Sequence, residues 1–361
     1  MKKLPLHKYH ADSGARFIDV RGWHIPADYG DVMQETETIH NTVALLDRSY
    51  LGKVLLKGPD AQDLLNRIST NDMMQLVMGI MCDTVFCTPK GRIVDYCRVL
   101  QYDDQLMLVS SYIDSANIID WINRFIILED IEVKDASADY LWLTVMGPEA
   151  RPFVQSLSGT PVVAEDETIW IQYETIQFAA LLNRNFIVPA YNFALPKTPG
   201  MEVFKWLTAS LKQFDGMLIG DRAYQVLRVE SGMPDWGTEL TQDYNPHEAR
   251  LLHAVSFTKG CYTGQEVIAR LDTYDKVQKY LMIIDLEEEI FDAPPFKIFY
   301  DDEEIGLLTS YAFNPATQRS VGLAYIRKHF AVAEFNITIQ VLVAGKFIPG
   351  RMRIPPVHDM G

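Results

Sequence analysis

The chain lacks any long uncharged apolar run, and its 361 residues include only four cysteines. A membrane-spanning helix needs about 18 consecutive apolar residues, so the sequence predicts no membrane span. Residues 1–8 are basic, but no apolar core of a signal peptide follows them. We therefore expect a cytoplasmic protein whose cysteines are reduced thiols rather than a disulfide framework.

Basic residues are scarce relative to acidic ones. There are 33 Lys and Arg against 48 Asp and Glu, a formal net charge of −15. Nucleic-acid binders usually carry a clustered positive field, so this balance argues against a nucleic-acid partner. A small anionic ligand needs only a few local cations and stays compatible. The eight histidines have no metal-ligand spacing, and no nucleotide-binding fingerprint is found, so we predict no metal site and no nucleotide chemistry.

Two segments repeat one plan of strand, turn and helix start. Residues 54–65 and 143–154 each contain an apolar strand, a Gly-Pro dipeptide that ends it, and an acidic residue where a helix begins. From about Lys279 onward the pattern changes to six short strands separated by turns. We expect an α+β fold, with two related α+β units over residues 1–278 and a small C-terminal β-barrel over residues 279–361.

Several motifs resemble one family along nearly the whole chain. They are Gly22-Trp23-His24-Ile25-Pro26, Leu46-Asp47-Arg48-Ser49, Thr70-Asn71-Asp72, the central run Leu227-Arg228-Val229-Glu230-Ser231-Gly232-Met233-Pro234, and Gly306-Leu307-Leu308-Thr309-Ser310. Together they resemble the glycine-cleavage T-protein, the tetrahydrofolate-dependent aminomethyltransferase. The octet Lys259-Gly260-Cys261-Tyr262-Thr263-Gly264-Gln265-Glu266 is similar to the signature of the YgfZ-type branch, folate-binding proteins that support iron–sulfur enzymes.

The resemblance implies two intertwined α+β units around a central channel that holds tetrahydrofolate, with the barrel as a third part. The sequence departs from the family at the reactive acid. The family has two consecutive aspartates after a glycine turn, and the second acts near the folate nitrogen that receives carbon; here Asp95 is followed by Tyr96. The family's tyrosine earlier in the same hairpin corresponds to Asp83, and its pterin-binding loop is rewritten at residues 186–191. These changes argue against standard aminomethyl transfer and standard pterin recognition.

Three residues are candidates for chemistry. Cys261 lies near Lys259 and just before a predicted helix, and a neighbouring ammonium and a helix N-terminus both favour a reactive thiolate. The alternatives are a small buried cysteine at a tight turn and an ordinary surface lysine. Lys259 could also pair with the folate tail. Asp95 could be a displaced acid or base, or else a turn or pairing residue.

A second group of residues is predicted to contact the folate. In the family the arginine at position 228 sits by the folate pocket, whereas a buried ion pair is the competing interpretation. Carboxylates could accept hydrogen bonds from a pterin or cap turns, and aromatic rings could stack on it or pack in the core. The predicted contacts are Arg228, Glu230, Glu239, Glu248, Tyr262, Gln265 and Tyr96.

Three functions stay open at this point. The first is a tetrahydrofolate-binding YgfZ-type protein that supports iron–sulfur cluster enzymes through Cys261, with iron–sulfur proteins as partners. The second is a tetrahydrofolate-dependent aminomethyltransferase or methyltransferase of the T-protein type. The third is a non-catalytic scaffold with a degenerate folate pocket. Whether the chain is an enzyme is left open, and one-carbon transfer to tetrahydrofolate is the reaction expected if it is.

Overall fold

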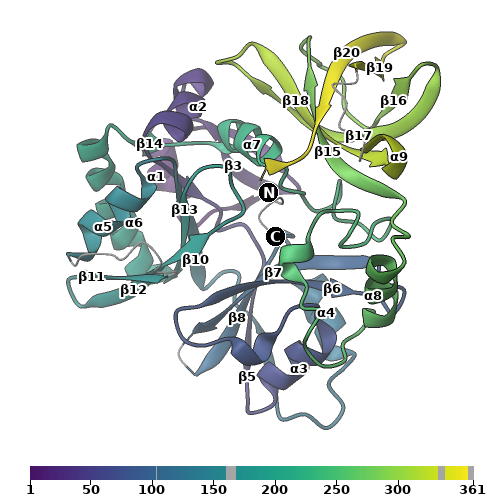
Figure 1. The fold of residues 1–361 in the computed structure, drawn as a ribbon. Coiled ribbons are helices and arrows are strands. Elements are labelled where there is room, and N and C mark those ends of the chain that lie inside the picture. Colours follow the sequence, from purple (N-terminus) through teal and green to yellow (C-terminus); the bar gives the residue numbers. More distant parts are fainter. Residues whose placement is uncertain (103, 160–167, 332–337, 357–361) are drawn as a thin grey trace. The chain divides into compact units, whose positions relative to one another are not determined.

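The computed structural model describes residues 1–102, 104–159, 168–331 and 338–356 (Figure 1). The chain divides into two compact units. Unit 1 comprises Met1–Leu65, Met73–Cys82 and Cys97–Tyr224. Unit 2 comprises Asn66–Asp72, Asp83–Tyr96 and Gln225–Gly361. The division at residue 278 stays a prediction, and residues 357–361 of its second part lie outside the described residues.

A six-stranded sheet in unit 1 has the order β11-β12-β13-β10-β4-β14. Helices α5 and α6 lie against it (Figure 1), and Phe153 and Phe204 of these helices share a core with Leu143 and Phe193 of the sheet. The alternation of apolar residues in β10 and β13 places these side chains on the helix-covered face. The elements are β4 Ala44–Asp47, β10 Tyr140–Met146, α5 Ala150–Ser158, β11 Thr168–Tyr173, β12 Ile176–Asn183, β13 Ala190–Pro196, α6 Lys197–Leu211, η2 Lys212–Phe214 and β14 Met217–Leu218.

A five-stranded sheet has the order β6-β7-β8-β5-β9, and strands β6 and β7 run through both units. Its strands are β5 Lys53–Lys57, β6 Met81–Cys87, β7 Ile93–Tyr102, β8 Gln105–Ser110 and β9 Glu132–Asp135. The helices between these strands in the sequence are α3 Ala61–Ile68, η1 Met73–Gln75 and α4 Ala116–Asn123. The N-terminal residues form a smaller sheet of order β1-β3-β2. Its strands are β1 Lys2–Lys3, β2 Arg16–Val20 and β3 Trp23–Asp28. Helix α1 His7–Asp12 comes between β1 and β2 in the sequence, and helix α2 Val32–Asn41 follows β3.

The two predicted Gly-Pro units are confirmed as strand, turn and helix: β5 leads into α3 and β10 leads into α5. Gly58 and Gly147 both have positive φ, +135° and +127°. A Cβ atom at these positions would lie 2.0 Å from the Asp130 carbonyl oxygen and 2.3 Å from the Thr42 carbonyl oxygen. Both turns therefore require glycine, which explains why the same dipeptide recurs.

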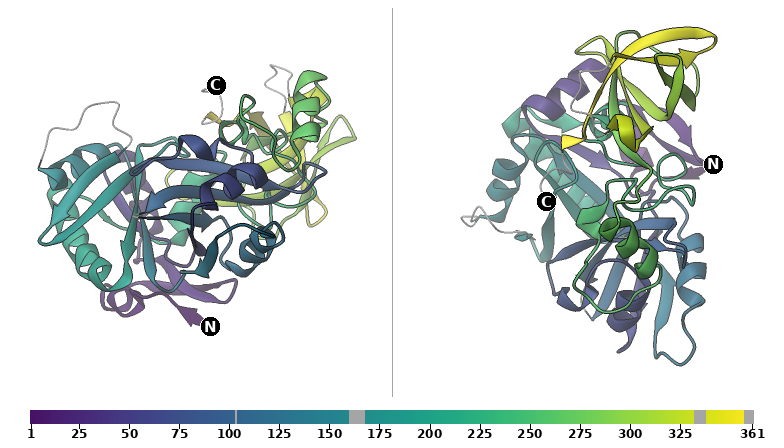
Figure 2. Two further views of the ribbon diagram at one scale, coloured as in Figure 1. Left: turned by 90° about the horizontal axis from the view of Figure 1, so that it is seen from below. Right: turned by 45° about the vertical axis from the view of Figure 1, so that its right-hand side comes forward.

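The C-terminal strands close into a barrel of order β15-β18-β17-β16-β19-β20, as the strand pattern predicted. In the turned views of Figure 2 these strands, coloured light green to yellow, stay together as one group. Leu308, Ile326 and Val341 are among the fully buried residues of the barrel core. The elements of unit 2 include α7 Asp221–Glu230, which begins in unit 1, η3 Leu252–Ala254, α8 Gln265–Thr273, β15 Lys279–Leu286, β16 Phe296–Tyr300, β17 Glu303–Asn314, β18 Arg319–Arg327, α9 Lys328–Ala331, β19 Thr338–Val343 and β20 Lys346–Arg353.

Lys53 is a fully buried lysine at the start of β5, and its Nζ donates to the carbonyl oxygens of Ser49 and Leu51 at 2.9 and 2.7 Å. Burial lowers the pKa of Lys53 to about 7, although the negative charges of Asp47 and Asp135 act to raise it. The unfolded chain therefore binds more protons than the folded chain between about pH 7 and 10.5. The free energy of unfolding should rise with pH across this window.

Replacing Lys53 by Met should remove this rise, which amounts to at most about 1.4 kcal/mol per pH unit. Urea unfolding of the wild type and the variant at pH 7.5 and pH 9 measures the two slopes. Lys57→Met is the matched control, because Lys57 ends the same strand but pairs with Asp104 in solvent, and it should leave the slope unchanged. Equal slopes for the wild type and Lys53→Met would contradict the assignment.

Candidate functional site

A tyrosine and a carboxylate meet on the hairpin of β6 and β7 in unit 2. The tight turn is closed by Thr88 and Arg92, whose backbone N–H and carbonyl oxygen are 2.8 Å apart. The Tyr96 hydroxyl donates to Asp83 Oδ2 at 2.5 Å, and the tyrosine side chain is almost fully buried. Asp95 is also buried, but as the preceding residue of the strand its side chain points to the opposite face. The carboxylate beside Tyr96 is thus Asp83, which the sequence had marked only as a departure from the family.

His253 approaches the same pair from η3. Its Nε2 lies 3.4 Å from the Tyr96 hydroxyl and 3.8 Å from Asp83 Oδ2. The histidine side chain is 35% exposed and that of Asp83 16% exposed, so this cluster of three groups reaches solvent. The sequence did not single out His253, because it belongs to none of the family motifs and lies 157 residues from Tyr96.

The segment 66–72 ties this cluster together. The Thr70 hydroxyl donates to the carbonyl oxygen of Ala254 in η3 at 2.6 Å and accepts from the backbone N–H of Val85 in β6 at 2.9 Å. The side-chain amide of Asn71 donates to the carbonyl oxygen of Asp83 at 2.8 Å. Thr70 therefore holds the backbones that carry His253 and Asp83, and Asn71 adds a second contact to Asp83.

Lys259 in turn holds the segment 66–72 in place. Its Nζ donates to the carbonyl oxygens of Asn66, Ser69 and Asn71 at 2.6, 2.9 and 2.5 Å. An ammonium has three protons, so these three acceptors use its whole donor capacity. The amine also lies 5.2 Å from the centre of the Tyr262 ring, and burial raises the pKa of the Tyr262 hydroxyl. This set of contacts is that of a structural clamp, and the alternative of an ordinary surface lysine is wrong.

Cys261 is exposed on the loop that precedes α8, so the alternative of a buried cysteine is wrong. Gln265 begins α8, and its side-chain amide reaches the Gly260 carbonyl oxygen at 3.5 Å across the same loop. Gly264 caps the helix with a φ of +87°, and a Cβ there would lie 2.7 Å from the Thr88 carbonyl oxygen. The octet thus forms a tight loop that presents one thiol to solvent.

Arg228 forms an ion pair with Glu239, both within unit 2. Arg228 lies in α7, where Glu230 projects from a different side of the helix. Its guanidinium donates to Glu239 Oε2 at 3.4 Å, to the Met233 carbonyl oxygen at 2.9 Å and to the Ser310 hydroxyl at 3.1 Å. Glu239 is fully buried and also accepts from the Thr309 hydroxyl at 2.5 Å. These contacts favour the buried ion pair over a folate contact for both residues.

The other two glutamates are held by asparagines. Glu230 Oε1 accepts from the side-chain amide of Asn314 at 2.7 Å. Glu248 and Asn245 exchange two hydrogen bonds between side chain and backbone N–H, at 3.1 and 3.0 Å. Burial raises the pKa of Glu248, although the positive charges of Lys279 and Arg92 act to lower it. For Glu248 this reciprocal pairing favours the turn-capping interpretation.

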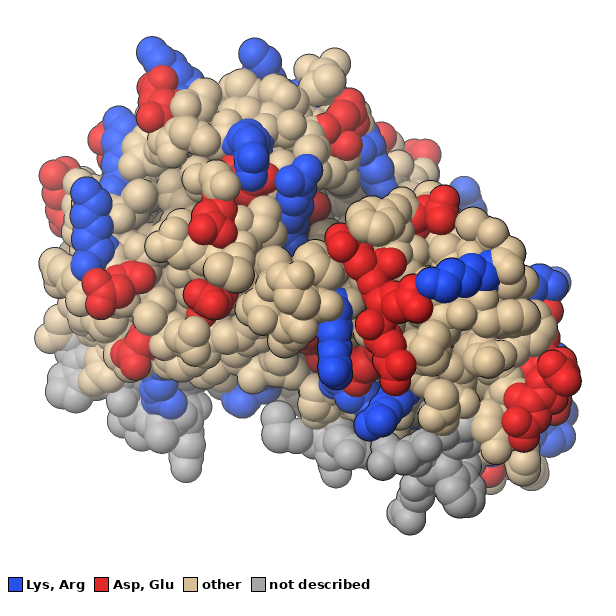
Figure 3. Space-filling view, turned by 90° about the horizontal axis from the view of Figure 1, so that it is seen from above, with Lys and Arg blue, Asp and Glu red and all other residues tan. Residues whose placement is uncertain are grey.

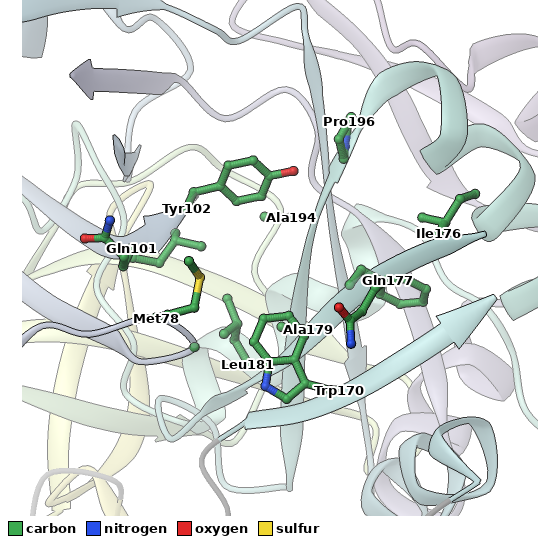
Figure 4. A pocket seen from close by; sticks show the side chains of 13 residues that line it. Met78, Gln101, Tyr102, Trp170, Ile176, Gln177, Ala179, Leu181, Ala194 and Pro196 are labelled. Atoms are coloured by element: carbon green, nitrogen blue, oxygen red, sulfur yellow. The ribbon is translucent and has the colours of Figure 1, made fainter. Parts of the chain in front are cut away.

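A pocket of about 140 Å³ opens in unit 1 (Figure 4). The side chains of Met78, Leu181 and Trp170 lie close together in it and come from three different segments. A cavity of about 150 Å³ holds a benzene-sized ligand, so the pocket can take one aromatic ring. Its lining residues are Met78, Gly79, Leu100, Gln101, Tyr102, Trp170, Ile176, Gln177, Phe178, Ala179, Leu181, Ala194 and Pro196.

The surface charges are mixed: on the face shown in Figure 3, Lys and Arg side chains are interspersed with Asp and Glu. Among the described residues, no three His, Cys, Asp or Glu side chains are grouped so that they could hold a metal ion. Within the same residues, no helix is long and apolar enough to cross a membrane.

Comparison with known proteins identifies relatives over the whole chain. Curated relatives include a putative chloroplastic transferase of Arabidopsis thaliana, 28% identical over 86% of this chain and 71% of its own length, and the aminomethyltransferase of Shouchella clausii, 27% identical over 99% and 97%. The solved aminomethyltransferase T of the glycine cleavage system of Bartonella henselae superimposes with a TM-score of 0.82 over 99% of this chain and 98% of its own, at 20% identity. That structure supports the same fold, a mixed α and β architecture with a C-terminal barrel.

Two family models match the chain and leave few residues unassigned. The GCVT N-terminal domain matches residues 6–259, and the glycine cleavage T-protein C-terminal barrel domain matches residues 281–359. The first match alone covers more than half of the chain. The chain therefore belongs to the glycine cleavage T-protein family, in which its curated relatives include aminomethyltransferases.

Proposed function

We propose that this chain is a tetrahydrofolate-dependent one-carbon transferase of the aminomethyltransferase type, whose reactive carboxylate is Asp83. The observation that carries the proposal is the 2.5 Å hydrogen bond between the Tyr96 hydroxyl and Asp83 Oδ2. In the resembling family the tyrosine precedes the hairpin turn and the aspartate follows it. Here the two residue types have exchanged places, so the pair itself is retained.

The exchange preserves the chemistry, because the two side chains lie on neighbouring strands and meet at one point. A carboxylate at position 83 can therefore place an oxygen close to the point where a carboxylate at position 96 would place one. A nearby hydroxyl donor stabilises the ionised carboxylate by a charge-assisted hydrogen bond. Asp83 is the general acid–base group in this proposal. Asp95 lies on the opposite face of β7 and takes no part in the reaction in this proposal.

The other predicted site residues take supporting roles in the proposal. Lys259 fixes the segment 66–71 and through it the position of Asp83, rather than binding the folate tail. Arg228 and Glu239 join α7 to the barrel. Tyr262 packs under the Lys259 ammonium.

The test of the proposed function is direct. Purified protein is mixed with tetrahydrofolate and an aminomethyl donor, and methylene- or methyl-tetrahydrofolate is measured. Product formation at a rate above that of the donor and folate alone is the expected result. Folate binding without product would contradict the transferase, and absence of folate binding would favour the non-catalytic scaffold.

A second candidate is the YgfZ-type role, a folate-binding protein that maintains iron–sulfur enzymes. The observation that favours it is the exposed thiol of Cys261 on the octet loop. In this reading Cys261 acts next to bound folate and the iron–sulfur proteins are its partners. Cellular activity of iron–sulfur enzymes in a strain that carries Cys261→Ala tests it, and full activity would exclude the thiol role.

A further inference from the structure

We propose that His253 transfers protons between the Asp83–Tyr96 pair and solvent, as a third member of the reactive cluster. The inference rests on the proposed one-carbon transfer and adds to it a residue that belongs to none of the family motifs. His253 acts through the pair rather than on the folate, so it is a positioning and relay residue.

The three groups lie within 4 Å of one another, and of the three Tyr96 is the most buried and His253 the most exposed. Tyr96 is buried, and its hydroxyl contacts the carboxylate of Asp83 at 2.5 Å and Nε2 of His253 at 3.4 Å. The tyrosine and histidine rings are 6.2 Å apart and inclined by 69°, so the imidazole edge rather than its face meets the hydroxyl. The imidazole is about one-third exposed and can exchange protons with water.

The position of His253 is fixed by its backbone. η3 is a single short turn, and a free turn of this length would fray. The Thr70 hydroxyl binds the carbonyl oxygen of Ala254, and the backbone N–H of Ser256 donates to the Thr70 carbonyl oxygen at 3.0 Å. Thr70 also accepts from Val85 on the strand that carries Asp83. One threonine therefore sets both the histidine and the carboxylate, which is the preorganisation that proton transfer needs.

The transfer reaction supplies the protons to be moved. Each C–N bond formed at a folate nitrogen replaces an N–H bond, and each bond broken at the donor carbon leaves an atom that takes up a proton. Asp83 receives the nitrogen proton as an O–H bond. Once protonated, Asp83 donates to the Tyr96 oxygen, and the tyrosine hydroxyl turns from Asp83 to Nε2 of neutral His253. The carboxyl proton then passes to the Tyr96 oxygen while the tyrosine proton passes to Nε2. The imidazolium then releases a proton from Nδ1 to water. The reverse order delivers a proton to the leaving group, so no proton is gained or lost overall.

The experiment compares His253→Ala and His253→Gln with the wild type in the transfer assay. We expect kcat to fall about 100-fold in both variants, with KM for tetrahydrofolate unchanged. Added imidazole should restore a large part of the rate of His253→Ala and none of that of His253→Gln, whose side chain fills the space. Leu252→Ala, the preceding residue of η3, is the matched control and should retain the wild-type rate. Calorimetry and thermal unfolding establish that each variant binds folate and is folded.

The outcomes separate this inference from the proposed function. A wild type that transfers carbon, together with a His253→Ala variant of equal rate, overturns the relay alone. A slow variant that imidazole does not rescue also overturns it, because a structural role gives that result. A wild type that forms no product overturns the proposed function and the relay with it. Loss of rate with rescue by imidazole supports both.

Discussion

Asp83→Asn is expected to lower the rate of carbon transfer to tetrahydrofolate by about 10³-fold while leaving folate affinity nearly unchanged. General acid–base groups contribute about 10²- to 10⁴-fold, and asparagine keeps the shape of aspartate but cannot take up a proton. The Tyr96 hydroxyl can still donate to the amide oxygen, so the local structure should persist. Single-turnover measurement of methylene- or methyl-tetrahydrofolate gives the rate directly.

Exchanging the pair back provides a sharper form of this test. Asp83→Tyr and Tyr96→Asp alone each place two like residues side by side, and each should lose activity. The double variant restores the order found in the family and should recover much of the wild-type rate. Recovery in the double variant can only arise if the two positions act as one unit. A double variant as slow as the singles, although folded, would show that the place of the carboxylate matters more than its presence.

Two further variants decide between the functional readings. Asp95→Asn should transfer carbon at close to the wild-type rate, because Asp95 points away from Tyr96. Cys261→Ala should also transfer carbon normally if the transferase reading is right. A large loss of iron–sulfur enzyme activity in a strain that carries Cys261→Ala, with normal activity in an Asp83→Asn strain, would instead favour the thiol-based function.

The fold could be predicted because its determinants are local. The Gly-Pro turns at Gly58 and Gly147 and the short alternating strands after Lys279 each express a backbone requirement within a few residues. Helix α8 likewise follows from Gly264 and the apolar spacing after it. Signals of this kind need no knowledge of distant contacts.

The site was less predictable, because its contacts join distant parts of the chain. The acceptors of Lys259 are backbone carbonyl oxygens about 190 residues earlier, and carbonyl groups leave no trace in side-chain sequence. Asp83 and Tyr96 depart from the family at two separate positions of the sequence, and only the structure shows that their side chains hydrogen-bond across a hairpin. The turn at Thr88 to Arg92 was the signal that could have joined them, because it makes the two strands neighbours.

The ion-pair partner of Arg228 was also hard to predict from the sequence. Glu230 is the acidic residue nearest to Arg228 in the sequence, but residues two apart on a helix project to different sides. The actual partner, Glu239, lies 11 residues away. The pair is completed by two hydroxyls of β17, those of Thr309 and Ser310, and by the Met233 carbonyl oxygen. A buried charge needs a partner, but the sequence does not say which one.

Glu239→Ala is expected to destabilise the protein by about 3–5 kcal/mol, because it leaves the Arg228 guanidinium buried without its counter-charge. The backbone N–H of Asp235 would lose its acceptor as well. Urea unfolding measures the loss. Glu304→Ala removes a carboxylate of the same barrel that pairs with Lys297 in solvent, and it should cost less than about 1 kcal/mol.

A double variant, Arg228→Met with Glu239→Leu, separates the cost of an unpaired charge from the worth of the pair. Replacing a buried ion pair by apolar residues of similar volume is often neutral or stabilising, so the double variant should be more stable than Glu239→Ala. If Glu239 instead bound the folate, Glu239→Ala would lose folate affinity while keeping its stability. That result would return Arg228 and Glu239 to the ligand site and would assign the joining of α7 to the barrel to other residues.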